Sequence, residues 1–269
     1  MFNLIKTDLK RIVKDKLFIV IGIIGVVFAV ITPLLMLGVN SMLDEQSAAM
    51  LGMSVNAKTL FFQAFDPTNN FGLVALILLC VILCKDFSQG TVRNKIICGK
   101  SRFSVFTSSF IASSIVLCSL MMLHAILTLG VSLIFFDYQS TPFTANDFGY
   151  LVVTLVFKLM TFVVISALVT FLSVLMKNAG LCMVMLLAIT MLATIVGSVL
   201  SAVIIGVEDE IIKGVLEFFV KTNVFLSTVT GSGITYSLSD VLCVVLSHIV
   251  YGVLFYVLGV VVFRKKDIK

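Results

Sequence analysis

One short basic segment carries the only pattern in the sequence that suggests nucleotide chemistry. Gly99, Lys100 and Ser101 match the end of a phosphate-binding loop, where a lysine reaches phosphates and a hydroxyl reaches magnesium. That motif also requires a glycine five residues before Gly99, and the chain has Asn94 there. The segment follows an apolar run and not a strand. We therefore expect that this chain binds neither ATP nor magnesium.

The two histidines and the paired cysteines do not complete a metal site. His124 and His248 lie in apolar segments without the HExxH spacing of zinc proteases, which favours hydrogen bonding between helices. Cys80 and Cys84 share a helix face, but no third or fourth ligand is evident. We expect all six cysteines to be small buried apolar residues without a disulfide framework. The chain is thus expected to hold no metal, no cofactor and no catalytic residue, which argues against an enzyme.

Lys158 is a charged residue inside an apolar run, TLVFKLMTF, where a charge is costly and marks a functional site by default. It could line a substrate path. Alternatively, it could extend toward the head groups or pair with an acid such as Asp147 or Asp240. Ser109 and Ser113 could line the same path, although small residues at this spacing also let membrane helices pack closely.

The elements that position these residues follow from composition. Of 269 residues, 60% are hydrophobic and only 12% are charged, whereas soluble domains are about half apolar and about a quarter charged. Each membrane-spanning helix needs about 20 mainly apolar residues. Six such helices would leave no room for a globular domain of about 100 residues. The chain is therefore expected to be an all-α integral membrane protein.

Hydropathy divides the chain into an amphipathic N-terminal helix over residues 1–16 and one transmembrane domain over 17–269. The first segment alternates apolar and basic residues at helical spacing, as in helices that lie in the membrane interface. The second span is short unless Phe61–Phe65 enters the membrane before it. The predicted spans are about 17–39, 70–84, 105–136, 150–176, 181–207 and 239–263.

The distribution of charge predicts the orientation. Most of the 19 Lys and Arg residues fall in the N-terminal segment, the 85–103 connection, the turn at Lys177 and the C-terminal tail. Loops with an excess of Lys and Arg stay in the cytoplasm. With six spans, the two ends must lie on one side, so both termini are expected to be cytoplasmic.

Two motifs resemble those of type-2 ABC transporter permeases. DFSQGTVR at 86–93 and IICGKSR at 96–102 are similar to the segment that precedes the third span in that family, and FRKKDI at 263–268 is similar to its usual ending. The Lys-Ser pair after Gly99 departs from the family, in which many members have a proline nearby. The six-span layout matches over essentially the whole chain. The closest resemblance is to permeases of lantibiotic immunity and bacitracin resistance.

The resemblance implies a permease subunit in a bacterial plasma membrane. Its spans would export a hydrophobic or amphipathic cargo, such as an antimicrobial peptide or a lipid-like molecule. Separate ABC ATPase subunits would bind the cytoplasmic face and carry the ATP and magnesium. A second permease copy or a related permease would complete the transporter; membrane lipid is a further partner, and nucleic acid is not. The alternative is a non-transporting membrane sensor or immunity protein that binds a partner or toxin.

The resemblance also assigns residues to the ATPase contact. Gly90 would permit a turn, and Thr91 would cap the following helix. Arg93 and Arg102 would make two-pronged contacts to carboxylates of the partner. The full predicted coupling set is Asp86, Gly90, Thr91, Arg93, Gly99, Ser101 and Arg102.

The segment 208–238, before the last span, is expected to lie outside. The resemblance implies re-entrant helices here that form a lid, with GSG at 231–233 as a break between them. An acidic start suits a helix N-terminus, and Glu217 and Lys221 can pair one helical turn apart. We expect this helix to lie on, or dip into, the outer leaflet. The predicted lid residues are Glu208, Asp209, Glu210, Phe218 and Phe219.

Overall fold

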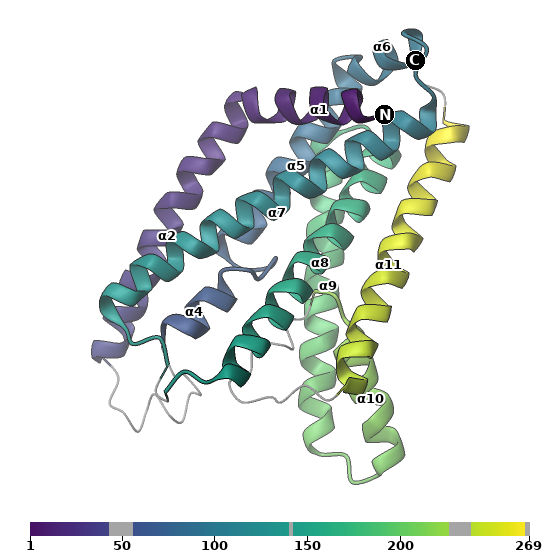
Figure 1. Ribbon diagram of the computed structural model, residues 1–269. Coiled ribbons are helices and arrows are strands. Elements are labelled where there is room, and N and C mark those ends of the chain that lie inside the picture. Colours follow the sequence, from purple (N-terminus) through teal and green to yellow (C-terminus); the bar gives the residue numbers. More distant parts are fainter. Residues whose placement is uncertain (43–55, 140–141, 226–237, 267–269) are drawn as a thin grey trace.

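The computed structural model describes residues 1–42, 56–139, 142–225 and 238–266, and every regular element in those ranges is a helix. Six of these helices are long and apolar enough to cross a membrane. This confirms the expected all-α, multi-pass membrane architecture, with observed helix ends within five residues of the predicted ones. The six helices are α2 (Lys16–Met42), α5 (Asn70–Ser88), α7 (Arg102–Phe135), α8 (Ala145–Met176), α9 (Ala179–Ile205) and α11 (Leu238–Lys265) (Figure 1).

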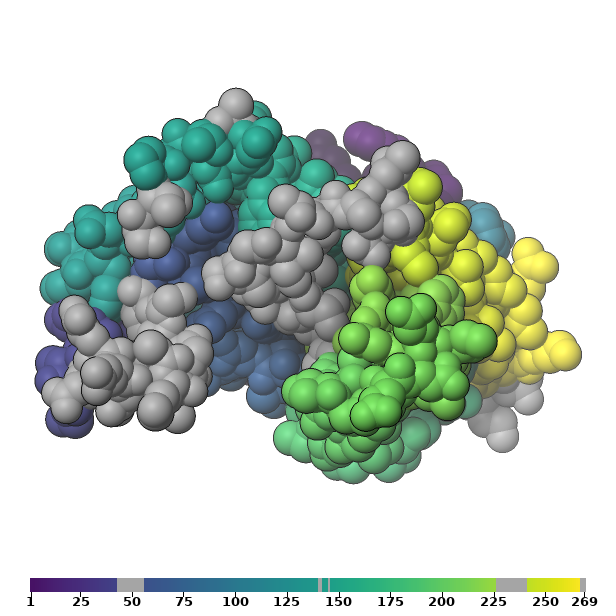
Figure 2. All heavy atoms as spheres, turned by 90° about the horizontal axis from the view of Figure 1, so that it is seen from below, coloured from purple at the N-terminus to yellow at the C-terminus, as the bar shows by residue number. Residues whose placement is uncertain are grey.

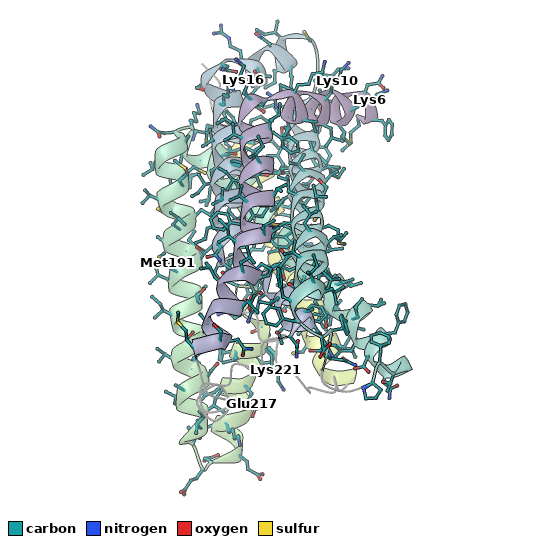
Figure 3. All side chains as sticks on the ribbon, turned by 90° about the vertical axis from the view of Figure 1, so that its left-hand side faces the viewer. Lys6, Lys10, Lys16, Met191, Glu217 and Lys221 are labelled. Carbon is teal, nitrogen blue, oxygen red and sulfur yellow. The ribbon has the colours of Figure 1, made fainter. Side chains whose placement is uncertain are left out.

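One end of the bundle carries both ends of the described chain. The amphipathic helix α1 (Phe2–Lys14) lies across this end, beside α6 (Thr91–Ile97) and the close of α11 (Figure 1). Lys6, Lys10 and Lys16 also lie here, so we call it the basic end (Figure 3). The two ends of the chain therefore share a side, as predicted. That this side faces the cytoplasm remains a prediction.

A short helix, α4 (Ala57–Gln63), enters the bundle from the opposite end and does not cross it (Figure 1). Its N-cap is Asn56, which forms a capping box with Thr59. Phe61 and Phe62 are buried in the main hydrophobic core, as is Phe65 beyond the helix, and Leu60 is also buried. Whether Phe61–Phe65 enters the membrane before the second span, the alternative that the sequence left open, stays a prediction.

The longest helix, α7, has 34 residues and crosses the bundle obliquely (Figure 1). At 1.5 Å per residue it is about 50 Å long, which exceeds the ~30 Å hydrocarbon core and explains the tilt. Ala112 and Ser113 are buried at its crossing with the central helices. His124 faces the carbonyl oxygen of Gly25 in α2 at 3.0 Å, which is the interhelical hydrogen bond expected for this histidine.

At the opposite end, α9 and α10 (Glu210–Thr222) form an antiparallel hairpin that projects past the other helices (Figures 1 and 3). Seen from this end, α10 lies beside the beginning of α11, on the far side of the molecule from α2 (Figure 2). The expected ion pair between Glu217 and Lys221 is present at 3.7 Å. The helix expected in this segment is present as α10, which folds back along α9. The GSG at 231–233 lies outside the described residues.

The helices differ in how much of their apolar surface the chain itself covers. The core lies around α5, α7 and α8, whereas α2, α9 and α11 expose apolar residues along their length. Met191, for example, points outward from α9 (Figure 3). Such surfaces are stable only against lipid or another apolar surface, which fits helices at the edge of a membrane bundle.

Candidate functional site

The predicted coupling segment lies at the basic end, where α1 is fixed to α5 by an ion pair. Both terminal nitrogens of Arg11 donate to the two carboxylate oxygens of Asp86. The side chain of Asp86 is only 6% exposed, whereas that of Arg11 is 33% exposed. Arg11 forms the two-pronged geometry that arginine and carboxylate favour. Asp86 was predicted to face a partner, and the structure instead turns it inward to hold α1.

Asp8 makes a second connection from α1, to α6 and α7. Its carboxylate accepts hydrogen bonds from the Nζ of Lys95 at 2.5 Å and from the hydroxyl of Ser108 at 2.6 Å. Asp8 is almost fully buried, and burial lowers the pKa of Lys95, although the neighbouring carboxylate opposes this shift. The bridge ties the three helices together.

Asp15, between α1 and α2, makes a third connection, to α5. It accepts a hydrogen bond from Lys85 at 2.7 Å, and this bond holds the pKa of Asp15 below its ordinary value. The carboxylate therefore stays ionised near neutral pH. Through these three ion pairs α1 lies on the bundle as one body with α5 and α6.

Two glycines shape the connection between α5, α6 and α7. Gly90 and Gly99 have φ values of +68° and +80°, which other residues rarely adopt. Gly90 is the N-cap of α6, without a side-chain cap, so the prediction that Thr91 caps this helix is wrong. Ser101 caps α7 by accepting a hydrogen bond from the Ser104 amide. The turn after Gly99 thus closes without the proline that is frequent in the resembling family.

Arg102 joins the start of α7 to the end of α11. Its Nη1 donates to the carbonyl oxygens of Arg264 at 2.9 Å and Lys266 at 2.7 Å. In turn, the Nζ of Lys266 donates to the carbonyl of Val174 at 2.8 Å, near the end of α8. The last carbonyl groups of a helix have no hydrogen-bond donor within that helix, and here Arg102 and Lys266 donate to them. The structure therefore gives Arg102 an internal contact; a contact with a partner remains a prediction.

Beneath these contacts is a small hydrophobic cluster that joins four helices. It holds α6 against the bundle and leaves the other face of α6 uncovered. Its buried members are Val92, Val105, Phe106, Val174 and Phe263.

The uncovered face of α6 combines charge and apolar surface. Arg93 is exposed, and Ile97, one turn further along, has 71% of its surface exposed. Asn94 and Lys100 are also exposed beside them. The described surface of α6 thus brings charged, polar and apolar side chains together, and its contact with a partner remains a prediction.

Lys158 has an acidic partner that the sequence did not suggest. Its Nζ lies 2.5 Å from a carboxylate oxygen of Asp66, which follows α4, and its side chain is 6% exposed. Asp147 instead pairs with Lys58 at 3.6 Å, and the side chain of Asp240 lies outside the described residues. Pairing was one of the two predicted alternatives, and the buried pair fixes α4 against α8.

The other predicted path residues lie on α7. Ser113 is buried and donates to the carbonyl of Phe110 at 2.8 Å, with the hydroxyl of Thr170 3.4 Å away. Ser109 is half-buried at a very small cavity near the basic end. Neither lies near Lys158 in the contacts that the structure gives, so the three residues do not form one lining.

The predicted lid residues lie on and before α10. Asp209 caps the helix by accepting from the amides of Ile211 and Ile212. Glu208 and Glu210 are exposed, and Phe218 and Phe219 are each about half exposed. The structure thus brings these residues together on one hairpin. Their role as a lid remains a prediction.

Sequence reasoning missed two features. Asp8 was overlooked, although an acid at helical spacing from Ile5 and Ile12 on an amphipathic helix signals burial on the apolar face. The grouping of Cys182 with Cys80 and Cys84 was also missed: all three are buried in the main hydrophobic core. Among the described residues, no group of three or more side chains has the arrangement of a metal site. Cys98 is exposed, so the expectation that all cysteines are buried is wrong.

Comparison with known proteins places the chain in a family. Residues 68–269, which contain α5 to α11, match a family described as "Protein of unknown function (DUF2705)". No curated protein matches the chain. The helices α1, α2 and α4 precede the matched region, and the ion pairs of Asp8 and Arg11 join α1 to it. Because the match covers well over half of its length, the chain belongs to the DUF2705 family.

Proposed function

We propose that this chain is the permease subunit of an ATP-driven ABC exporter in a bacterial plasma membrane, with the basic end in the cytoplasm. Its six spans would form half of the pathway, and a second copy or a related permease would form the other half. ATP and magnesium would be held by separate ATPase subunits.

The observation that carries this proposal is the surface of α6. If a separate ATPase supplies the energy, the permease needs a rigid surface on which this soluble partner can act to move the permease helices. The ion pairs of Asp8 and Arg11 anchor the surroundings of α6, while Arg93 and Ile97 face outward. This surface lies in the segment whose sequence resembles the ATPase contact of type-2 ABC permeases.

The cargo proposed is hydrophobic or amphipathic, such as an antimicrobial peptide or a lipid-like molecule. Lys158, a charge inside a span, is paired with Asp66, so this charge is compensated within the protein and does not favour a charged cargo. The uncovered apolar surfaces of α2, α9 and α11 offer room for a second permease.

The proposal is tested by purifying the tagged full chain from the membranes of its own cells. An ABC ATPase should co-purify, and the complex should hydrolyse ATP. Arg93→Glu and Ile97→Asp should each weaken this association by about 10- to 100-fold, because a charge-assisted bond contributes about 1.5–3 kcal/mol and a charge cannot occupy an apolar contact.

The matched control is Ile211→Asp, which places the same charge at an isoleucine that is 80% exposed at the opposite end. It should leave the association unchanged. If no ATPase co-purifies, or if Arg93→Glu and Ile97→Asp both bind it normally, the proposal is wrong. A non-transporting sensor or immunity protein would then account better for the chain.

A further inference from the structure

A groove of about 420 Å³ runs along α11 where this helix lies against α7 and α8. Val163, Ile249 and Val253 are exposed on its walls, so it opens sideways, toward the membrane. Its floor is made by α8. The residues that line it include Thr107, Phe110, Val163, His248, Val253 and Tyr256.

The polar side chains on the wall are paired within the protein. The Thr107 hydroxyl donates to the carbonyl of Phe103 at 2.9 Å, so the contact of 2.7 Å with Tyr256 is donated by the tyrosine. His248 donates from Nδ1 to the carbonyl of Val244, and its Nε2 is 3.0 Å from the hydroxyl of Thr161. An occupant therefore needs no hydrogen bonds, which suits a hydrocarbon chain.

The groove follows α11 from His248 to Tyr256, and Arg264 lies eight residues beyond it, toward the basic end. From Ile249, α11 continues for 15 residues to Arg264, which is about 22 Å at 1.5 Å per residue. Half of a bilayer with its head-group region measures about 20–22 Å. A chain in the groove would thus end near the bilayer midplane, while its head group would lie level with Arg264.

The head-group end of the groove carries a positive charge. Arg264 is exposed, and its guanidinium lies 5.9 Å from the centre of the Phe103 ring on α7. Eleven residues, close to three helical turns, separate it from Val253, so both point to the same side of α11. Phe103 likewise lies one turn before Thr107 on α7. Arg264 and Phe103 therefore lie on two of the helices that line the groove, beyond its end at Thr107 and Tyr256.

We propose that this groove binds one anionic phospholipid, with an acyl chain between α7 and α11 and its phosphate on Arg264. An empty groove would forfeit dispersion contacts along its walls, and an acyl chain from the surrounding leaflet restores them. Arginine provides the planar donors that match a phosphate. The inference depends on the chain crossing a membrane and not on the proposed transport function.

The test uses the purified full chain in detergent, to which phosphatidylglycerol or phosphatidylcholine with the same acyl chains is added. Bound lipids are counted by native mass spectrometry. One phosphatidylglycerol should remain bound about fivefold more tightly than phosphatidylcholine, the preference that one basic residue near the head groups provides. Arg264→Gln should abolish this preference. The matched control, Lys265→Gln, removes an equal charge from the adjacent residue, which lies about 100° further around α11, and should retain the preference.

A second variant tests the groove itself. Val253→Trp should fill it from an exposed wall position and remove one bound lipid of either kind, while circular dichroism and thermal melting verify the fold. If the lipid count stays unchanged in Val253→Trp, or if both charge variants lose the preference equally, the groove does not hold a lipid. A shift in oligomeric state with Val253→Trp, without loss of lipid, would make the groove a protein interface and overturn the proposal.

Discussion

Unequal effects are expected when the two partners of the Arg11–Asp86 ion pair are removed one at a time. Replacing Arg11 by Gln leaves the carboxylate of Asp86, whose side chain is 6% exposed, without its cation. Replacing Asp86 by Asn leaves Arg11, which is one-third exposed and still has Asp8 at 3.8 Å. The first change strands a buried charge, whereas the second leaves a charge that water can reach.

The magnitudes follow from this difference in burial. Stranding a buried charge costs about 3–5 kcal/mol, and the lower end applies because Asp86 lies near the end of α5. An ion pair open to water contributes up to about 1 kcal/mol. The docking of α1 should therefore weaken by about 3 kcal/mol in Arg11→Gln and by about 1 kcal/mol in Asp86→Asn. These values correspond to roughly 100-fold and fivefold changes in the docking equilibrium.

Hydrogen exchange in lipid nanodiscs measures this equilibrium at the amides of α1, which exchange when the helix detaches from α5. The amides of α9, remote from the pair, serve as the internal control and should exchange at unchanged rates. Arg11→Gln combined with Asp86→Asn should exchange more slowly than Arg11→Gln alone, since no charge is stranded. If Asp86→Asn accelerates exchange as much as Arg11→Gln, the asymmetry in burial does not govern the pair, and the reasoning is refuted.

Two further predictions concern the interior. Gly72→Ala should destabilise the protein by about 1–3 kcal/mol, because a Cβ there would lie 2.3 Å from the carbonyl oxygen of Asp66. The control is Gly22→Ala, whose Cβ would meet nothing within 4 Å. In detergent, the melting temperature should fall for Gly72→Ala and stay unchanged for Gly22→Ala. Lys158→Met should lower the free energy of unfolding in dodecyl sulfate by about 3 kcal/mol, and adding Asp66→Leu should recover most of it. A double variant as unstable as Lys158→Met would contradict this account of the pair.

The spans could be predicted because membrane crossing depends on local composition. In lipid, the backbone N–H and C=O groups of each apolar run must form hydrogen bonds within that run, which a helix provides. Hydropathy alone therefore locates the helices. Helix ends were harder to locate: α5 continues from the predicted end at residue 84 to Ser88, through Lys85 and Asp86. Hydropathy detects the limit of the lipid, whereas a helix ends where capping and turn residues such as Gly90 stop it.

The partners of charged residues could not be predicted from sequence where the two residues lie far apart along the chain, unlike the pair of Glu217 and Lys221 one helical turn apart. Arg11 and Asp86 are 75 residues apart, and Lys158 and Asp66 are 92 apart. Nothing local to any of these residues identifies its partner, because the pairing depends on how the helices pack. Residues with local roles were easier to anticipate, such as Gly90 at a turn.

The contacts of Arg102 also constrain the order in which the protein is made. Arg102 is synthesised 164 residues before Lys266, whose carbonyl it binds, and Lys266 in turn binds the end of α8. At translation rates of about 5–20 residues per second, roughly 10–30 s pass between the two. During that interval the carbonyl partners of Arg102 do not exist, and α7 must remain inserted without them. Three helices of the basic end, α7, α8 and α11, thus become connected through these bonds only after α11 has been made.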